Sequence, residues 1–242
     1  MTRYTSVNPV GLIGGMSWES TSVYYRLLNE KMQAAMGGHH SFPCVIHSMD
    51  FDAFERLSHQ EDWDAIAEML FDMALDLERA GVSAIALCSN TAHLVVDSLR
   101  KRTAMPVISI VESVGRSISE KQFRKVALLG TRFTMTHGFY QTMISHWCNA
   151  QIMIPEETAM NSVHHIIYNE LCKGVVSHES RNTFLKIIDD LKKEGAEAVI
   201  LGCTEIGMLI GQSDASLEVL DSTLLHCDSI IQYAFNQSKN PD

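Results

Sequence analysis

The sequence predicts an α/β protein of two pseudo-symmetric lobes, each a parallel sheet flanked by helices, with a candidate site in the cleft between them. Short apolar runs that end at glycine or polar residues alternate along the chain with longer segments of helical spacing. A second observation is an internal repeat, in which a stretch near residue 80 recurs near residue 194. The alternation indicates parallel sheets, and the repeat indicates that there are two of them.

The repeat consists of LERAGVSAIALCSNTAH at residues 77–93 and LKKEGAEAVILGCTEIG at residues 191–207. Each copy contains the end of a charged helix, a glycine turn, a buried strand and a short polar segment. Aligning the two glycine turns places Ser89 opposite Cys203. VGLIGGM near the N-terminus likewise matches VALLGTR in the middle of the chain. We therefore expect each half to contribute one reactive side chain to the candidate site.

The order of predicted elements follows from these patterns. Strands are expected near residues 10–13, 43–47, 83–87, 107–110, 126–129, 151–154, 198–201 and 219. Helices are expected over about residues 17–36, 63–80, 91–102, 112–120, 135–147, 157–172, 179–194 and 223–236, with another helical region that breaks near 58–60. We expect a first lobe of residues 1–108 plus 213–242 and a second lobe of residues 109–212.

Composition narrows the class of protein. The 242 residues are 46% hydrophobic, enough for a large core, and the net charge of −10 argues against nucleic-acid binding because little would neutralise phosphates. The six cysteines are scattered without a CxxC pair, which favours reduced thiols in a cytoplasmic protein. No apolar run has the length of a signal peptide core or a membrane span, so we expect a soluble protein with no membrane partner.

The sequence lacks the common cofactor and metal motifs. The glycine turn GLIGGMS is neither the dinucleotide fingerprint nor a Walker A loop. The adjacent pairs His39-His40 and His164-His165 have neither i, i+4 nor CxxC spacing, so no metal site is expected.

The candidate site lies where parallel strands end, because ligands of α/β sheets bind beyond the carboxyl ends of strands. Helix N-termini that follow these strands present backbone N–H groups that suit a carboxylate. Cys203 precedes a helix, a location that can lower the pKa of a thiol, although a free cysteine is more often a small buried hydrophobe. The repeated strand ends are residues 14–16, 89–91, 130–131 and 203–205, and the candidate site residues among them are Met16, Ser89, Asn90, Thr91, Thr131, Cys203 and Thr204.

Other residues near these positions have two interpretations each. Cys88 is a competing thiol, but the repeat points it into the core. His93 could hydrogen-bond within the site or be a structural histidine at a helix start. Lys173 could reach an acidic substrate or remain a solvated surface residue, and Ser58 and His59 are further candidates for binding a side-chain carboxylate.

Four motifs carry a family resemblance. GLIGGMSWEST, CSNTAH, LLGTRFTM and GCTEIG occur in this order and resemble the aspartate/glutamate racemase family, which needs no pyridoxal phosphate. The resemblance covers about residues 10–235 and is strongest to the L-aspartate/glutamate-specific branch. It implies two pseudo-symmetric lobes, no cofactor, a homodimer and a two-base mechanism. It also implies that Asn90, Thr91 and Thr204 hold the substrate α-carboxylate, and that Met16 and Thr131 line the site.

One position departs from the family pattern. Most members of the family that this chain resembles have cysteine where this chain has Ser89. In the L-specific branch, the residue at this position resembles threonine, which is also a hydroxyl. A hydroxyl is a much weaker base than a thiolate. We therefore expect Cys203 to remove the α-proton of L-aspartate or L-glutamate, with Ser89 serving the other face and with poor turnover of the D-enantiomer.

Two other functions remain open on the same scaffold. Relatives with one cysteine resemble decarboxylases that protonate an enediolate, and relatives with two cysteines resemble cis–trans isomerases of dicarboxylates. A third interpretation is a protein that binds small carboxylates without catalysis, in which Ser89 stands in place of a catalytic residue that has been lost.

Overall fold

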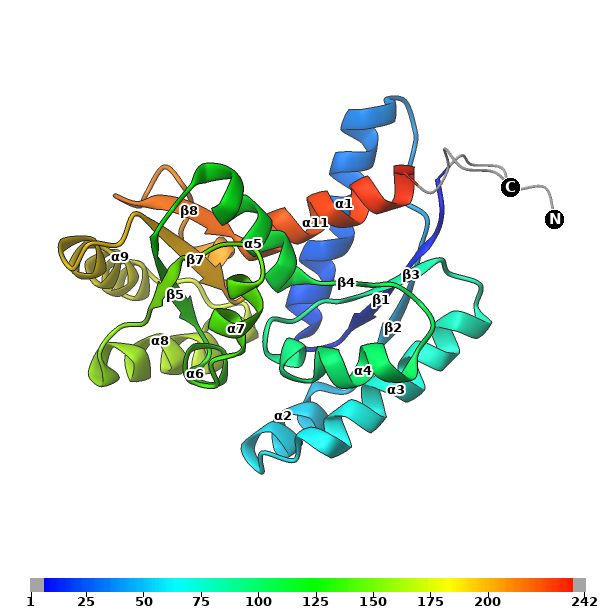
Figure 1. The fold of residues 1–242 in the computed structure, drawn as a ribbon, viewed down its shortest axis with the longest axis horizontal. Coiled ribbons are helices and arrows are strands. Elements are labelled where there is room, and N and C mark those ends of the chain that lie inside the picture. The colour runs from blue at the N-terminus through cyan, green and yellow to red at the C-terminus, as the bar shows by residue number, and fades with distance from the viewer. Residues whose placement is uncertain (1–6, 237–242) are drawn as a thin grey trace. The chain divides into compact units, whose positions relative to one another are not determined.

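The computed structural model describes residues 7–236, which form two parallel sheets flanked by helices (Figure 1). The chain divides into two compact units. Unit 1 holds the described residues up to Ser109 and those from His226 onward, and unit 2 is Ile110–Leu225. The predicted α/β class with two parallel sheets is confirmed.

Unit 1 contains a sheet of strand order β2-β1-β3-β4, in which every pairing is parallel. Its elements are β1 (Val10–Gly14), α1 (Trp18–Met36), β2 (Cys44–Ser48), α2 (Phe51–His59), α3 (Trp63–Arg79), β3 (Ala84–Leu87), the 3-10 helix η1 (Thr91–Val95), α4 (Val96–Arg102), β4 (Val107–Ile108) and most of α11 (Ser222–Asn236).

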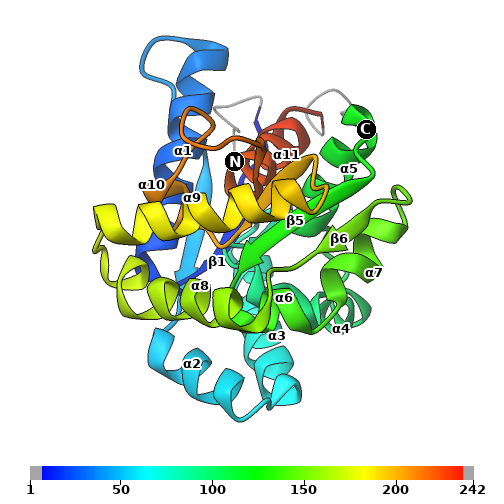
Figure 2. The same ribbon diagram turned by 90° about the vertical axis from the view of Figure 1, so that its left-hand side faces the viewer.

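Unit 2 repeats this order, β6-β5-β7-β8, again with parallel pairings throughout. Its elements are α5 (Ile110–Lys121), β5 (Lys125–Gly130), α6 (Arg132–Thr136), α7 (Phe139–Ser145), β6 (Gln151–Met153), α8 (Glu157–Asn169), the 3-10 helix η2 (Leu171–Lys173), α9 (His178–Lys193), β7 (Ala198–Gly202), α10 (Ile206–Leu209) and β8 (Glu218–Asp221). Helices α8 and α9 lie side by side (Figure 2).

The expected boundary near residue 213 is wrong. Strand β8 pairs with β7, so it completes the second sheet as β4 completes the first, and residues 213–225 belong to unit 2. The chain returns to unit 1 only within α11, at His226.

Two predicted helices are interrupted in the structure. The segment expected as one helix over 135–147 forms α6 and α7, because Gly138 adopts a positive φ of 72° that no helix continues through. The helix expected over 157–172 ends at Asn169, and the 3-10 turn η2 follows and closes at Gly174, which also has a positive φ.

The core of unit 1 forms on the two faces of its sheet. Strands β1 and β3 are buried along their whole lengths, which explains their continuous apolar runs. Leu12 packs toward α1 and α11 in a cluster that also contains Leu28 and Cys227. The opposite face packs against α3, where a Cβ added at Gly11 would lie 2.9 Å from a methyl carbon of Leu77. Successive side chains of β1 point to opposite faces of the sheet and therefore pack against two different layers of helices.

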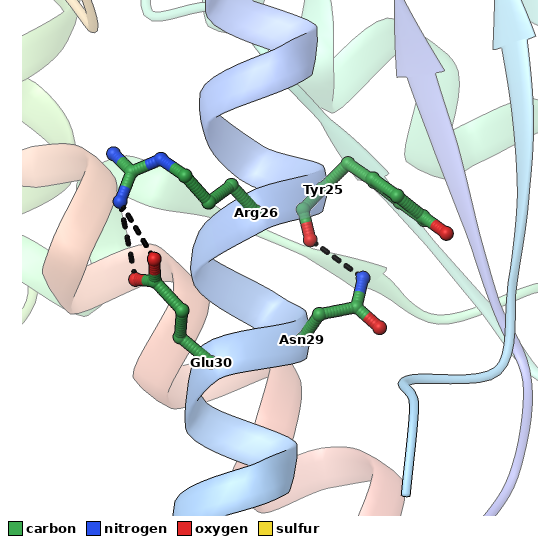
Figure 3. A network of polar contacts seen from close by, with 4 residues as sticks. All are labelled: Tyr25, Arg26, Asn29 and Glu30. Carbon is green, nitrogen blue, oxygen red and sulfur yellow. Dashed lines mark hydrogen bonds and ion pairs between the residues drawn. The ribbon is translucent and has the colours of Figure 1, made fainter. Parts of the chain in front are cut away.

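Residues one turn apart on α1 form polar contacts with one another (Figure 3). Arg26 Nη1 lies 2.9 Å from Glu30 Oε1, one helical turn away, and Asn29 Nδ2 donates to the carbonyl oxygen of Tyr25 at 2.7 Å. Such i, i+4 pairs support a helix locally without fixing its packing.

In the part of the chain that the structure describes, no helix is both long enough and apolar enough to cross a lipid bilayer.

The turn after β1 requires glycine at position 15. Gly15 has φ +91°, and a Cβ there would overlap the carbonyl oxygen of Met49. We expect Gly15→Ala to lower the free energy of unfolding by about 2–4 kcal/mol, because the cost of a positive φ in alanine adds to the cost of the steric overlap with Met49. Gly81→Ala is the control, since Gly81 also has a positive φ but open space around it, and should cost only about 1 kcal/mol. Equal losses in urea unfolding would contradict the packing argument.

Candidate functional site

In unit 1, the predicted site residues follow β1 and β3, which are neighbouring parallel strands. Because the register pairs Ile13 with Leu87, the turn after β1 and the segment after β3 lie at the same edge of the sheet. Ser20 Oγ, at the start of α1, donates to the carbonyl oxygen of Cys88 at 2.8 Å and ties the two strand ends together. The four predicted residues of this edge are all buried: Met16, Ser89, Asn90 and Thr91.

The backbone of Ser89 is held by His93. The ring nitrogen Nδ1 of His93 lies 2.8 Å from the carbonyl oxygen of Ser89, and because a carbonyl only accepts, Nδ1 carries the proton. The hydroxyl oxygen of Ser89 accepts a long hydrogen bond of 3.4 Å from the N–H of Ala92. His93 therefore positions the segment that carries Ser89.

A second buried histidine lies behind His93. The rings of His93 and His226 pack edge to face, with centroids 6.1 Å apart. His226 Nε2 donates to the carbonyl oxygen of Ile108 at 2.9 Å, so Nδ1 accepts from the hydroxyl of Tyr24 at 2.7 Å. Burial, and then the neighbouring His226, lowers the pKa of His93 to about 3, and burial lowers the pKa of His226 to about 4. Both rings are neutral at physiological pH.

In unit 2, the equivalent strands β5 and β7 also end together, because the register pairs Gly130 with Gly202. Thr131 follows β5 and caps α6, accepting a hydrogen bond of 3.2 Å from the N–H of Thr134. Cys203 and Thr204 follow β7 and are buried. The two sheets therefore present matching polar segments, each at the carboxyl end of its own central strands.

A buried carboxylate, which sequence reasoning did not assign, organises the segment after β7. Glu205 is only 2% exposed, and its Oε2 accepts from Cys203 Sγ at 2.9 Å and from Thr204 Oγ1 at 2.6 Å. Its Oε1 lies 3.8 Å from Cys172 Sγ on η2. The repeat contains the signal that could have identified it, since Glu205 aligns with Thr91.

The expectation of a lowered pKa at Cys203 is wrong. Burial, and then the charge of Glu205, raises the pKa of the Cys203 thiol well above its usual range. The helix that follows, α10, has only four residues and offers little dipole to oppose these effects. Cys203 is therefore a thiol that is hydrogen-bonded to a carboxylate.

Thr204 directs its hydroxyl proton to Glu205, so that proton is not aimed at a ligand. The hydroxyl oxygen of Thr204 keeps its lone pairs, which can accept from a cationic group. A substrate carboxylate would instead be served by backbone N–H groups or by the other predicted donors.

The remaining predicted residues differ in their surroundings. Lys173 is exposed on η2, one residue after Cys172. Ser58 is fully buried in α2, where its hydroxyl donates to the carbonyl oxygen of Phe54 at 2.8 Å, so its proton is already used inside its own helix. His59 is exposed at the end of α2, and Cys88 lies in the apolar core of unit 1.

Metal-binding geometry is not found within residues 7–236, where no group of three or more His, Cys, Asp or Glu side chains could hold an ion. The arrangement found at the end of β7 is suited to moving a proton, because a thiol and a carboxylate share one hydrogen bond.

Comparison with known proteins gives a consistent result. Residues 13–230 match the family model described as Asp/Glu/Hydantoin racemase. The broad specificity amino-acid racemase RacX of Bacillus subtilis is 24% identical over 219 residues, which cover 88% of this chain and 92% of RacX.

Two crystal structures are similar over nearly the whole chain. A candidate Asp/Glu racemase from Yersinia pestis is 38% identical with a TM-score of 0.86. An aspartate racemase homologue from Pyrococcus horikoshii is 33% identical with a TM-score of 0.82. Each match covers 94% of this chain and 99% of the other.

The buried histidines predict a pH-dependent stability. In the unfolded chain, His93 and His226 bind protons below about pH 6.5, whereas in the folded protein they stay neutral down to about pH 3 and about pH 4. The free energy of unfolding should therefore fall as the pH drops below about 6.5, with each histidine costing about 2 kcal/mol at pH 5. Urea unfolding of His226→Gln should show a shallower loss between pH 7 and pH 5, and an unchanged slope would contradict a neutral, buried His226.

Proposed function

Because the chain belongs to the Asp/Glu/Hydantoin racemase family, we propose that it is a cofactor-independent racemase of acidic amino acids that prefers L-aspartate or L-glutamate. The observation that carries the proposal is the thiol of Cys203 at the end of β7, hydrogen-bonded to a buried carboxylate and matched by Ser89 at the equivalent position of the repeat. The racemase activity of RacX, a relative over most of both chains, also supports it.

The proposed reaction exchanges one proton at the α-carbon. The thiol of Cys203 first gives up its own proton to a neighbouring acceptor, and its sulfur then takes the α-proton of the L-enantiomer. The electron pair left on carbon is delocalised into the carboxylate. Ser89 then gives its hydroxyl proton to the opposite face, which produces the D-enantiomer, and the proton gained on the Cys203 side returns to the Ser89 oxygen through water. In the reverse direction the Ser89 oxygen must act as the base, and a hydroxyl is a poor one. Turnover should therefore be faster from the L-side.

Substrate binding uses neutral donors in this proposal. Asn90, Thr91 and Thr131 offer amide and hydroxyl groups to the α-carboxylate, and Met16 lines the site. Thr204 accepts from the α-ammonium group through its oxygen, because its own proton goes to Glu205. The exposed ammonium of Lys173 on η2 is the proposed partner of the side-chain carboxylate.

The single thiol of the pair favours a second candidate function. With Ser89 in place of a second cysteine, one thiol could protonate an enediolate after loss of CO2 from a malonate-type acid. Release of CO2 from such an acid, without α-deuterium exchange in L-aspartate or L-glutamate, would favour this decarboxylase. Binding of L-aspartate or L-glutamate without either reaction would indicate a carboxylate binder.

A homodimer in the cytoplasm completes the proposal. The reaction needs Cys203 unoxidised, and none of the six cysteines, all of which lie in the described part of the chain, forms a disulfide, which suits a reducing compartment. Light scattering coupled to size exclusion should give twice the 27.0 kDa of one chain. A mass equal to one chain at micromolar concentration would contradict the dimer and leave the catalytic proposal standing.

The decisive measurement is α-proton exchange in D2O. Wild-type protein should exchange the α-proton of L-aspartate or L-glutamate and form D-product, with rates unaffected by hydroxylamine, which traps pyridoxal phosphate, or by EDTA. Cys203→Ala should lower exchange by at least about a thousandfold, because it removes the base. Cys148→Ala, a half-buried thiol elsewhere in unit 2, is the matched control.

Ser89→Cys tests the second base. It should raise exchange from D-substrate by at least about tenfold, since a thiol ionises far more readily than an alcohol. No gain on the D-side, in a variant that unfolds like wild type, would contradict the role of Ser89.

A further inference from the structure

Glu205 stands out among the buried ionisable groups because it contacts the proposed base directly. Its Oε2 lies 2.9 Å from Cys203 Sγ, within the range of a hydrogen bond to sulfur. Thr204 donates to the same oxygen at 2.6 Å, and Cys172 approaches the other oxygen at 3.8 Å. Buried carboxylates are costly unless hydrogen-bonded, and here the neighbouring hydroxyl and thiols supply those bonds.

We propose that Glu205 receives the thiol proton of Cys203 during turnover, so that carboxylate and sulfur work as one proton-carrying pair. This inference rests on the proposed racemase function. Glu205 acts through Cys203 and is therefore a positioning residue, while Cys203 touches the substrate.

The step balances without any outside reactant. The S–H bond of Cys203 breaks, an O–H bond forms at Glu205 Oε2, and the negative charge moves from the carboxylate to sulfur. As this happens, sulfur takes the α-proton, so that the substrate becomes a carbanion and both Cys203 and Glu205 end protonated. The pair is reset when Glu205 gives its proton to water, from which the Ser89 oxygen recovers the proton that it gave to carbon.

The backbone of Glu205 supports the same step. It lowers the pKa of the Cys203 thiol, as the smallest of the influences on that pKa, because a backbone N–H favours negative charge on sulfur once the thiol proton has left. One residue therefore offers an acceptor for the proton and a donor for the resulting anion.

Other ionisable groups surround the pair. Cys172 on η2 approaches Glu205, and Tyr140 on α7 interacts with Cys203. Burial raises the pKa of Tyr140, so this phenol stays protonated at neutral pH. Asp221, at the end of β8, faces Gly207 on α10. Lys173, which follows Cys172 on η2 and is exposed, is the cation that we assign to the substrate.

The pH dependence of exchange tests the inference. In wild type the proton moves within the pair, so the rate of exchange from L-substrate should vary by less than about twofold between pH 6.5 and 8.5. In Glu205→Gln the thiol must lose its proton to solvent, so the rate should rise about tenfold per pH unit. A flat profile in Glu205→Gln, with a rate like that of wild type, would overturn the proposal.

Thiol reactivity provides a readout that does not depend on racemase activity. Alkylation of Cys203 by iodoacetamide, followed by peptide mass spectrometry, should be at least about fivefold faster in Glu205→Gln at pH 7, because the nearby negative charge is gone. Unchanged alkylation would show that the two groups are not coupled. If wild type fails to exchange protons but alkylation still responds, the proposed function fails and the pairing of Glu205 with Cys203 stands.

Two further variants separate this role from a structural one. Glu205→Asp keeps a carboxylate and should restore the flat pH profile at a reduced rate, which also covers the case in which Glu205→Gln does not fold. Glu170→Gln is the matched control, because Glu170 accepts from the hydroxyls of Ser177 and Ser180 in the same unit and should leave both readouts unchanged. A pH-dependent profile in Glu205→Asp like that of Glu205→Gln would contradict proton transfer.

Discussion

Parallel strand pairing is the constraint on which the arrangement of this protein depends. Parallel strands end at one edge of their sheet, so the residues that follow two neighbouring strands are brought together. In unit 1 this places the turn after β1 beside Ser89, and in unit 2 it places Thr131 beside Cys203. Glycines where these strands end leave room for the helix that follows, as the contact between Gly14 and Thr21 shows.

Hydrogen bonds then fix the polar segments at each edge. In unit 1 the segment is held from behind by neutral groups, since His93 and Ser20 bind the backbone carbonyls of Ser89 and Cys88. In unit 2 it is held by an acidic side chain, because Glu205 accepts from both residues that precede it. The repeated fold thus supports a hydroxyl in a neutral setting and a thiol beside a carboxylate, and this difference underlies the asymmetric chemistry that we propose.

The sequence predicted the fold class and most elements, because buried parallel strands are continuous apolar runs and the repeat doubled each signal. It located β8 near residue 219 but assigned this strand to the first lobe, because four residues do not show which sheet a strand joins. It placed Glu205 at the repeated strand end but gave it no role, because an acidic residue at a helix start normally indicates a solvated group. The thiol pKa was misjudged because the sequence does not show that α10 is a single turn. Gly138, by contrast, was a visible signal against one long helix.

The contact between His226 and Ile108 bears on how the chain is built. Ile108 lies just before the point where the chain leaves unit 1, and His226 is the residue at which it returns. The two crossing points are therefore a hydrogen bond apart, and unit 2 is a continuous insertion between two adjacent points of unit 1. Such an insertion leaves its host intact when its ends are close. Unit 1 is consequently a domain whose sheet is complete without the inserted segment, although its own sequence is split in two.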